Sequence, residues 1–387
     1  MRGPGVRPRS LDARALAALA ANPGCRRRAL LDGAGIDKGA LAQALGSPAA
    51  YGRSQFAIVR GHAFEARVTS DGGTELLRLL HERLAPGTPP PVPGEAATPD
   101  LSAAGPEGRT ARTALALRAA TAAGGWALLT HPMLAVEVAG APAYVEPDAV
   151  VVHPDGSWTV VEIKSFPMID GSADAAKVGA AARQAAVYVL ALEAVAGPAA
   201  AYTGREVTVR DRVLLVCPKD FSNLPTAAAV DVRKQLATTR RQLARLTRVE
   251  DIAAALPEGT TFDLRLADDG KTATRPPEEL TEAVEAVEAA YAPECLAACE
   301  LAFHCRGRSR AQGAVEALGR GVRGELGGLR TVGEVLAAAG PAGPGTAAAA
   351  GPDDPAVVAL RRAAALRAEA LGAAALPGPR AEEAECR

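Results

Sequence analysis

The chain has 387 residues, of which 48% are apolar and only 3% are aromatic. That length exceeds one small domain, so two or three units, or one enlarged domain with appendages, are expected. The 43 basic and 44 acidic residues give a net charge of −1. This balance excludes a whole-protein attraction to nucleic acid or another polyanion, so any such binding must come from local patches.

Neither the cysteine count nor the apolar segments point to an extracellular or membrane protein. Six cysteines are too few for a disulfide scaffold in a chain of this length. Asp12 and Arg14 interrupt the first apolar segment, so no secretory signal is expected. No run of about 18 uncharged apolar residues occurs, so no membrane span is expected. These features predict a cytoplasmic protein whose thiols are metal ligands or buried small side chains.

Hydrophobic periodicity predicts helices in the first third of the chain. The expected helices cover 12–21, 26–46, 55–69, 74–84 and 110–122. Seven prolines fall between Pro86 and Gly108, and this composition cannot hold a helix or a central strand. We therefore expect a mobile loop or linker at 86–108.

From residue 126 onwards the pattern becomes that of strands separated by helices. Val-rich runs predict strands at 134–138, 143–152, 158–164, 207–216 and 228–232. Helices are expected at 173–196, 233–249 and 355–371. This order of elements predicts an α/β layered fold with a mixed central sheet flanked by helices.

One predicted hairpin carries two carboxylates and a lysine. Its turn at 153–156 suits a three-residue connection with glycine in the left-handed conformation. Such a turn places Asp148 opposite Glu162, on the same face as Lys164. A two-residue turn would instead pair Asp148 with Ile163 and separate the carboxylates, unless a bulge corrected the register.

The facing carboxylates of Asp148 and Glu162 repel each other and are costly to bury without a counter-ion. A hard divalent cation relieves the repulsion, and oxygen ligands suit Mg²⁺ or Mn²⁺. Beside such a cation, Lys164 is placed to orient or deprotonate an attacking water, or to neutralise developing charge. The alternative interpretation is an edge hairpin whose three charged side chains are simply solvated.

Two further features accompany this hairpin in the sequence. Gln184 and Tyr188 stand four residues apart on the next predicted helix, so they share one face of it. Both are polar in a segment otherwise built largely from Ala, Val and Leu. Upstream, Glu65 follows Gly61 by four residues on an earlier predicted helix.

The ordered series Glu65, Asp148, Glu162-Ile163-Lys164 and Gln184-x-x-x-Tyr188 resembles the PD-(D/E)XK nuclease superfamily, in its RecB-like branch, over about residues 50–235. The resemblance implies a restriction-endonuclease-like core in which Glu65, Asp148 and Glu162 bind Mg²⁺ or Mn²⁺, with the Ile163 carbonyl as a further ligand. It implies that Lys164 assists hydrolysis and that Gln184 and Tyr188 support the site and contact DNA. Many RecB-like members carry histidine four residues after the glycine, so His62 is an alternative to Glu65 as the upstream ligand.

Three cysteines, Cys295, Cys299 and Cys305, cluster near the end of the expected folded part. They are one ligand short of a four-cysteine metal site, and Cys25 is the natural fourth. One cysteine before the core and three after it resembles the iron–sulfur branch of RecB-like nucleases, which implies a structural [4Fe-4S] cluster. A four-cysteine Zn²⁺ site and scattered buried thiols are the alternatives. Cys217, at the end of a Val-rich run, is expected to be a core thiol.

With this resemblance the chain divides into four expected segments. An N-terminal helical segment with the first cluster cysteine covers 1–49, and the nuclease core covers 50–250, including the insert at 86–108. A C-terminal helical segment with the other three cluster cysteines covers 251–338, and a low-complexity tail covers 339–387.

Local basic patches indicate where DNA would contact such a protein. Arg26, Arg27 and Arg28 follow the first cysteine, and the predicted helix at 233–249 carries six cations and no acid. Contacts of this kind are electrostatic and independent of sequence. A solvated helix face is the alternative interpretation.

These features together predict a metal-dependent DNA nuclease, and the resemblance implies exonuclease action on single-stranded DNA or DNA ends. No G-x-x-x-x-G-K-[ST] motif occurs, so unwinding would need a helicase or another DNA-processing partner. The alternative function is a non-catalytic DNA-binding or scaffold protein that keeps the iron–sulfur fold. The acidic hairpin speaks against it, because a scaffold has no need of clustered carboxylates.

Overall fold

The computed structural model describes two compact units. It covers residues 1–48, 55–85, 91–220, 222–340, 351 and 353–374. The first unit comprises Met1–Ala289 and Ala298–Leu301, and the second comprises Ala290–Ala297 and Ala302–Arg387. Every strand among the described residues belongs to the first unit, so the acidic hairpin and its sheet lie there.

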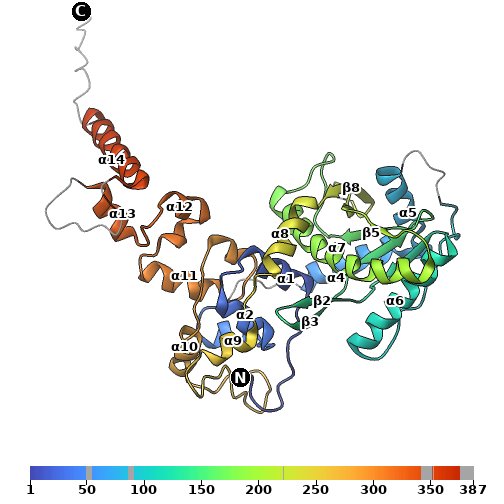
Figure 1. The fold of residues 1–387 in the computed structure, drawn as a ribbon, viewed down its shortest axis with the longest axis horizontal. Coiled ribbons are helices and arrows are strands. Elements are labelled where there is room, and N and C mark those ends of the chain that lie inside the picture. The colour runs from blue at the N-terminus through green and yellow to red at the C-terminus, as the bar shows by residue number, and fades with distance from the viewer. Residues whose placement is uncertain (49–54, 86–90, 221, 341–350, 352, 375–387) are drawn as a thin grey trace, which may run out of the picture. The chain divides into compact units, whose positions relative to one another are not determined.

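The first unit is built around a six-stranded mixed sheet, with a separate two-stranded hairpin (Figure 1). Its strands are β1 (Ala127–Thr130), β2 (Leu134–Val138), β3 (Ala141–Val145), β4 (Ala149–Val152), β5 (Ser157–Ile163), β6 (Thr208–Val209), β7 (Arg212–Pro218) and β8 (Pro225–Asp231). Along the order β1-β4-β5-β7-β8, neighbouring strands are antiparallel, apart from β5 and β7, which are parallel. The short strand β6 also pairs with β5 in parallel. β2 and β3 form the separate hairpin. The predicted mixed α/β layer is confirmed.

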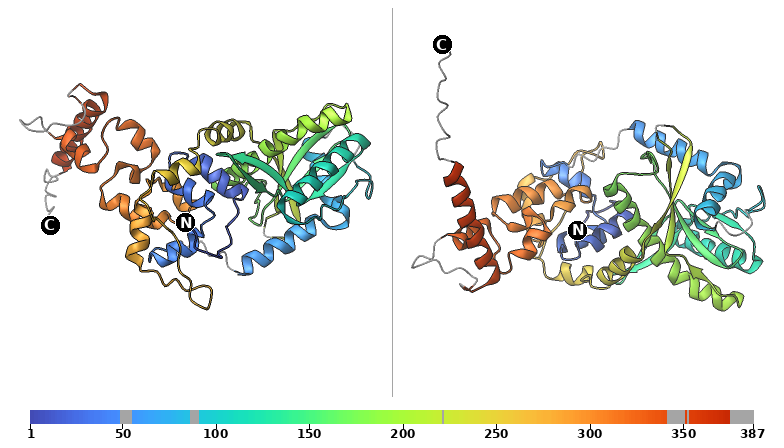
Figure 2. Two further views of the ribbon diagram at one scale, coloured as in Figure 1. Left: turned by 60° about the horizontal axis from the view of Figure 1, so that its bottom comes forward. Right: turned by 90° about the horizontal axis from the view of Figure 1, so that it is seen from above.

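Helices cover both faces of the sheet, and strand alternation decides what each face buries (Figure 2). Val161 and Leu214 pack with α4 (Gln55–Val68) and α5 (Ser70–Leu84) in one core cluster. Leu215 and Cys217 point to the other face, where they pack with Ala181 of α7 (Ala175–Thr203). Cys217 is fully buried, as expected for a core thiol.

The hairpin between β4 and β5 has the predicted register. The His153 N–H donates to the Ser157 carbonyl at 2.9 Å, which leaves a three-residue turn with Gly156 at φ +86°. Ala149 therefore pairs with Val161 across the two strands. The next pair outward along this register is Asp148 and Glu162, which follows from the turn length alone.

Several predicted elements are interrupted by caps and turns. The helix expected at 26–46 is two helices, α2 (Arg26–Gly33) and α3 (Lys38–Ala44), because the Asp37 carboxylate accepts the N–H groups of Gly39 and Ala40 and starts a new helix. The strand expected at 143–152 is likewise two strands, and so is the one expected at 207–216. The basic helix expected at 233–249 ends earlier, as α8 (Arg233–Leu243).

The remaining helices of the first unit are α1 (Ala13–Ala21), α6 (Gly105–Ala123), α9 (Val249–Ala254) and α10 (Pro277–Glu285). Strand β1 has no counterpart among the predicted strands. In the proline-rich segment, residues 86–90 lie outside the described part of the chain. Further along it, Ala97 exchanges backbone hydrogen bonds with Trp126 and Leu128 at the start of β1, which ties the segment to the sheet edge.

Helix α7 is apolar and long enough to cross a membrane by length and composition alone, and among the described residues it is the one helix that passes this test. Half of its most apolar window is buried inside the first unit. It contacts α1, α6, α8 and β5. A central core helix satisfies the same test, and this packing accounts for the composition of α7.

The second unit is helical. Its elements are η1 (Pro293–Ala297), α11 (Ala302–Ala311), η2 (Val315–Leu318), α12 (Arg320–Glu325), α13 (Val332–Ala339) and α14 (Pro355–Ala374). Val315, Leu329 and Val357 form its small core. Thr331 and Glu334 form a capping box that fixes the start of α13. The tail helix expected at 355–371 is present as α14.

The glycine of the hairpin turn offers a direct test of the register. A Cβ at Gly156 would lie 2.5 Å from the Glu206 carbonyl oxygen, in addition to the strain of its positive φ. We expect Gly156→Ala to lower the free energy of unfolding by roughly 2–4 kcal/mol. Gly171→Ala is the control, because Gly171 has φ +76° but nothing within 4 Å of its Cβ position. It should cost about 1 kcal/mol. Equal losses in urea denaturation would contradict the close approach at the turn.

Candidate functional site

The candidate site lies where β4 begins and β5 ends. The Asp148 carboxylate accepts the Ile163 N–H at 2.5 Å, which fixes it beside the last residues of β5. The Lys164 ammonium forms an ion pair with Glu162 Oε1 and lies 3.9 Å from Asp148 Oδ2. The Lys164 N–H donates to the Val216 carbonyl of β7 at 2.9 Å, so the parallel strand holds its backbone. The structure thus brings together the acid pair and the lysine that the sequence predicts.

Glu162 is the most deeply buried of these groups, with 1% of its side chain exposed. Burial raises its pKa from 4.5 to about 7, and the Asp148 charge adds to this, against the opposing effect of Lys164. Its Oε2 atom is buried and has no hydrogen-bond partner among the described residues. A single ammonium therefore leaves the Glu162 carboxylate incompletely compensated.

Asp148 experiences the same imbalance. Burial raises its pKa above the ordinary value, and the nearby Glu65 charge raises it further, whereas Lys164 and the Ile163 N–H oppose the shift. Two adjacent carboxyl groups with raised pKa values indicate that the nearby cations do not fully compensate the negative charge of the pair. Such clusters are typical of functional sites.

Glu65 reaches the same edge of the sheet from α4. His131 Nε2 lies 3.1 Å from Glu65 Oε1, and this contact, with other nearby cations, lowers the pKa of Glu65. In return, Glu65 raises the pKa of His131 above its ordinary value. His62, the alternative upstream ligand, has an exposed side chain, although its charge also reaches Glu65. The half-buried Glu65 is thus the better placed of the two.

His131 is a site residue that sequence reasoning missed. It follows β1 directly, with φ +48°, and its N–H donates to the Asp148 carbonyl at 3.1 Å. Its ring also lies 3.7 Å from Glu146, which Arg109 holds with two hydrogen bonds of 2.9 and 3.0 Å. The available signal was the pairing of Thr130 with Ala149, which places His131 opposite Asp148. The sequence analysis did not predict β1, so it did not predict this pairing either.

Gln184 and Tyr188 project from α7 towards the same acids. Gln184 Nε2 donates to the Tyr188 hydroxyl at 2.8 Å, which confirms that the two share one helix face. Tyr188 is buried, and burial raises its pKa far above the ordinary value, with Glu162 and Asp148 adding to the shift. The phenol therefore stays protonated and keeps one hydrogen to donate next to the carboxylates.

The donor set fits a hard divalent cation. It comprises Asp148 and Glu162, whose pKa values are raised, and Glu65, whose pKa His131 lowers. One Glu162 oxygen is buried without a partner among the described residues, and carboxylate oxygens are the ligands that Mg²⁺ and Mn²⁺ prefer. In the described part of the chain, no three acidic, histidine or cysteine side chains are grouped as closely as the ligands of a bound metal.

Cys25 and Cys299 lie in the first unit, and both are buried. Cys25 immediately precedes α2 at its N-cap position, without a side-chain capping bond, and Arg28 of that helix lies within reach of the Cys299 charge. Arg28 Nη1 donates to the Ala298 carbonyl at 2.6 Å, and Arg28 Nε pairs with Asp32 at 3.0 Å. Burial opposes the charge of Arg28, but Asp32 and then Cys299 outweigh it and raise its pKa.

The buried arginines correct one expectation about DNA contacts. Arg27 and Arg28 are 7% and 6% exposed. Arg27 donates to the Val287 carbonyl at 3.1 Å, and Lys38 adds ion pairs to Asp32 and to Glu300. Arg28 therefore fastens the segment around Cys299 to α2, and Arg27 fastens the chain at Val287 to the same helix, so neither is available to phosphates. Arg26 remains half-exposed.

Cys295 and Cys305 lie in the second unit, on η1 and α11. Both are half-buried. Burial raises the pKa of Tyr291, and the charges of both thiols raise it further against Arg306 and Arg310, so both thiols lie near this ring. Each unit thus contributes two of the four cysteines.

Comparison with protein-family models, with curated proteins and with solved structures finds no match for this chain. The functional assignment therefore rests on the residues themselves.

The burial of Glu162 predicts a specific pH dependence of stability. Its pKa is higher in the folded chain, about 7, than its ordinary value of 4.5. The stabilisation from its bound proton is therefore complete below about pH 4.5 and lost as the pH rises towards 7. In chelator, the wild type should lose on the order of 3 kcal/mol more than Glu162→Gln over this range.

Urea denaturation at a series of pH values measures this difference. Glu137→Gln is the control, because Glu137 is an exposed glutamate of β2. Its stability profile should follow that of the wild type. Parallel profiles for wild type and Glu162→Gln would show that Glu162 is not held in a desolvated environment.

Proposed function

We propose that this chain is a metal-dependent nuclease of the PD-(D/E)XK type, with a restriction-endonuclease-like core, that hydrolyses phosphodiester bonds of DNA. The observation that carries the proposal is the carboxylate pair beside Lys164, in which Glu162 is buried with an unpartnered Oε2 among the described residues and Asp148 is half-buried with a raised pKa. A solvated edge hairpin would leave both carboxylates in water with ordinary pKa values. Their burial favours the catalytic interpretation over that alternative.

In this proposal Mg²⁺ or Mn²⁺ is held by Glu65, Asp148 and Glu162, with the Ile163 carbonyl as a further oxygen. When bound, the cation supplies Lewis-acid activation of a phosphate oxygen and of water. Lys164 hydrogen-bonds water or a phosphate oxygen at the open side of the carboxylate pair. Its ammonium stabilises charge that develops on the phosphate.

The neighbouring side chains hold this arrangement. The Gln184 amide orients the Tyr188 hydroxyl by their 2.8 Å hydrogen bond, so the phenol proton is directed by a fixed partner. In the proposal the Tyr188 hydroxyl supports the carboxylates by offering its hydrogen as a hydrogen-bond donor beside them. His131 holds Glu65 at the edge of the sheet by their 3.1 Å contact. In the proposal it is a positioning residue, because it acts through Glu65.

The remaining parts of the proposal rest on the sequence pattern. Exonuclease action on single-stranded DNA or DNA ends, in the cytoplasm, is the mode it favours. A helicase or another DNA-processing protein would supply unwinding. A structural [4Fe-4S] cluster, held by Cys25, Cys295, Cys299 and Cys305, is the proposed stabilising group, with Zn²⁺ as the alternative metal.

The chemistry of the cysteine segment supports a thiolate-bound cluster. Arg28 places a buried positive charge near Cys299. A nearby cation favours the thiolate form that a metal requires. At the core thiol Cys217, by contrast, burial outweighs the nearby Lys164 charge and raises the pKa to about 12, so that thiol stays protonated.

Cleavage of labelled DNA in Mn²⁺ tests the catalytic proposal. The wild type should degrade a single-stranded oligonucleotide in Mn²⁺ or Mg²⁺ but not in chelator. Lys164→Ala should lower the rate by about 10²-fold or more, because it removes the group that stabilises charge in the transition state. Lys271→Ala, at an exposed lysine of the first unit, is the control and should cleave at the wild-type rate.

Two outcomes would overturn the catalytic proposal. One is no cleavage by well-folded wild-type protein at any divalent metal concentration. The other is undiminished cleavage by Lys164→Ala. DNA binding without cleavage would favour the scaffold function instead.

Anaerobic purification tests the cluster separately. The protein should be brown, absorb broadly near roughly 400 nm and contain about four iron atoms per chain. Cys299→Ser should lose the colour and the iron, whereas Cys217→Ala should keep both because Cys217 is a core thiol. A colourless protein containing stoichiometric zinc would identify the zinc alternative. A wild type without iron or zinc would reject both the iron–sulfur cluster and the zinc site.

A further inference from the structure

The segment 233–248, which includes α8, carries an unusual local charge. It contains six cations and no acid, although the whole chain has a net charge of −1. Its buried residues Leu236, Thr239 and Leu243 attach α8 to the first unit. The cations therefore occupy the other sides of the helix, and their partners decide what those sides can bind.

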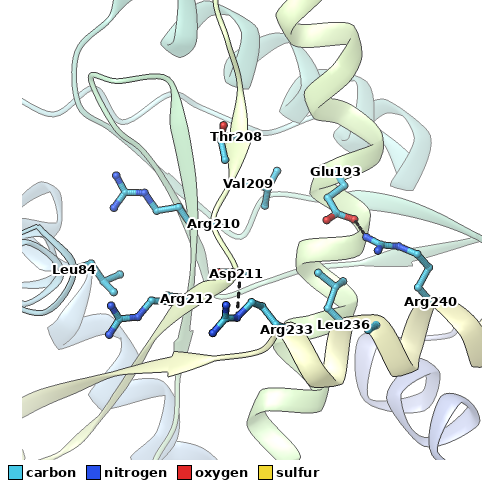
Figure 3. Close-up of a pocket in the computed structure, with 11 residues that line it drawn as sticks. Leu84, Glu193, Thr208, Val209, Arg210, Asp211, Arg212, Arg233, Leu236 and Arg240 are labelled. Carbon is cyan, nitrogen blue, oxygen red and sulfur yellow. Dashed lines mark hydrogen bonds and ion pairs between the residues drawn. The ribbon is translucent and has the colours of Figure 1, made fainter.

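One side of α8 is already neutralised. It borders a cavity of about 430 Å³ that also touches β6 and the start of β7 (Figure 3). At this cavity Arg240 pairs with Glu193 of α7, and Arg233 lies 2.5 Å from Asp231 and 3.6 Å from Asp211. The two α8 cations that line the cavity, Arg233 and Arg240, thus have acidic partners.

The other side of the segment carries cations without partners. Lys234, Arg241 and Arg245 are exposed, and within the described residues none of the three forms an ion pair or a side-chain hydrogen bond. Lys234 and Arg241 are two turns apart, so they share one face, about 10 Å along the helix. Arg245 follows in the turn after the helix. We call these three residues the basic stripe.

We propose that the basic stripe binds the phosphate backbone of a single nucleic-acid strand. Neighbouring like charges repel, and the stripe lacks the intervening acids that usually relieve such repulsion on a solvated helix. A polyanion with regularly spaced charges relieves it by releasing its own counter-ions. The proposal deepens the nuclease function, on which it rests, by naming where the substrate is held outside the catalytic edge.

The surroundings of the stripe favour nucleic acid over a membrane. An amphipathic helix that enters a bilayer needs an exposed apolar face. The large apolar side chains of α8, Leu236 and Leu243, are instead buried against the first unit. Their burial leaves electrostatic attraction as the means of binding, which matches backbone recognition.

Helix α8, which carries Lys234 and Arg241, packs against α7 of the candidate site. Arg240 joins α8 to Glu193 of α7, and α7 also carries Gln184 and Tyr188. Glu193 lies about 13 Å along α7 from Gln184. A strand of several nucleotides is longer than this segment of α7, and in the proposal it runs from the stripe to the carboxylates.

Salt-dependent binding in chelator tests this inference without any cleavage. The probe is a fluorescein-labelled oligothymidylate, and fluorescence anisotropy is measured over a series of NaCl concentrations. The test variant is Lys234→Gln/Arg241→Gln/Arg245→Gln. The matched control is Arg233→Gln/Arg240→Gln/Arg248→Gln, which removes the same charge from the same segment but from residues with ion-pair partners.

The stripe variant should bind roughly a hundredfold more weakly at 0.1 M salt. Its slope of log K against log salt should be shallower by about 2, from about 0.7 for each lost phosphate contact with a single strand. The matched control should keep a slope within about 0.5 of the wild type. Thermal unfolding should show that all three proteins are folded.

Other results would overturn the inference. Equal weakening of both variants would show that only net charge matters, and an unchanged slope in the stripe variant would place the contact elsewhere. Binding to phosphatidylserine vesicles but not to the oligonucleotide would identify a membrane surface. The binding assay contains chelator and no metal. A loss of binding in the stripe variant therefore supports the inference even if the cleavage test fails. Cleavage by the wild type together with an unchanged salt slope in the stripe variant would reject the stripe but not the nuclease function.

Discussion

The register of one hairpin determines whether this chain has a functional site at all. A three-residue turn, with Gly156 in a left-handed conformation, places Asp148 opposite Glu162 on the face that α7 covers. A shift by one residue would direct one of the two carboxylates to the opposite face. Every other candidate group, from Lys164 to Tyr188, is arranged around this pair.

The charges at the site are arranged by elements that are distant in sequence. Glu65 arrives on α4 and His131 at the end of β1, while Lys164 is held by a backbone hydrogen bond to β7. The protein supplies one ammonium and one histidine for three acids, and the deepest carboxylate, Glu162, keeps an unpaired oxygen. Buried charge that stays incompletely compensated costs stability, and in the proposed function a bound cation would offset that cost.

Basic residues in this chain have at least three different functions, although they look alike in the sequence. Arg27 and Arg28 are buried, and they tie the chain at Val287 and the Cys299 segment, respectively, to α2. Arg240 is paired with an acid at a cavity. The basic stripe has no such partners. Because arginine binds carbonyls, carboxylates and phosphates equally well, only its burial and its neighbours separate these functions.

The sequence by itself determined the mixed α/β layer, the hairpin register and the shared face of Gln184 and Tyr188. These features depend on short-range rules, namely strand alternation, turn length and helical spacing. Tertiary structure alone decided that Arg28 is buried and that His131 joins Glu65 to the edge of the sheet. Those outcomes depend on contacts between residues far apart in the chain, and local patterns carry no record of such contacts.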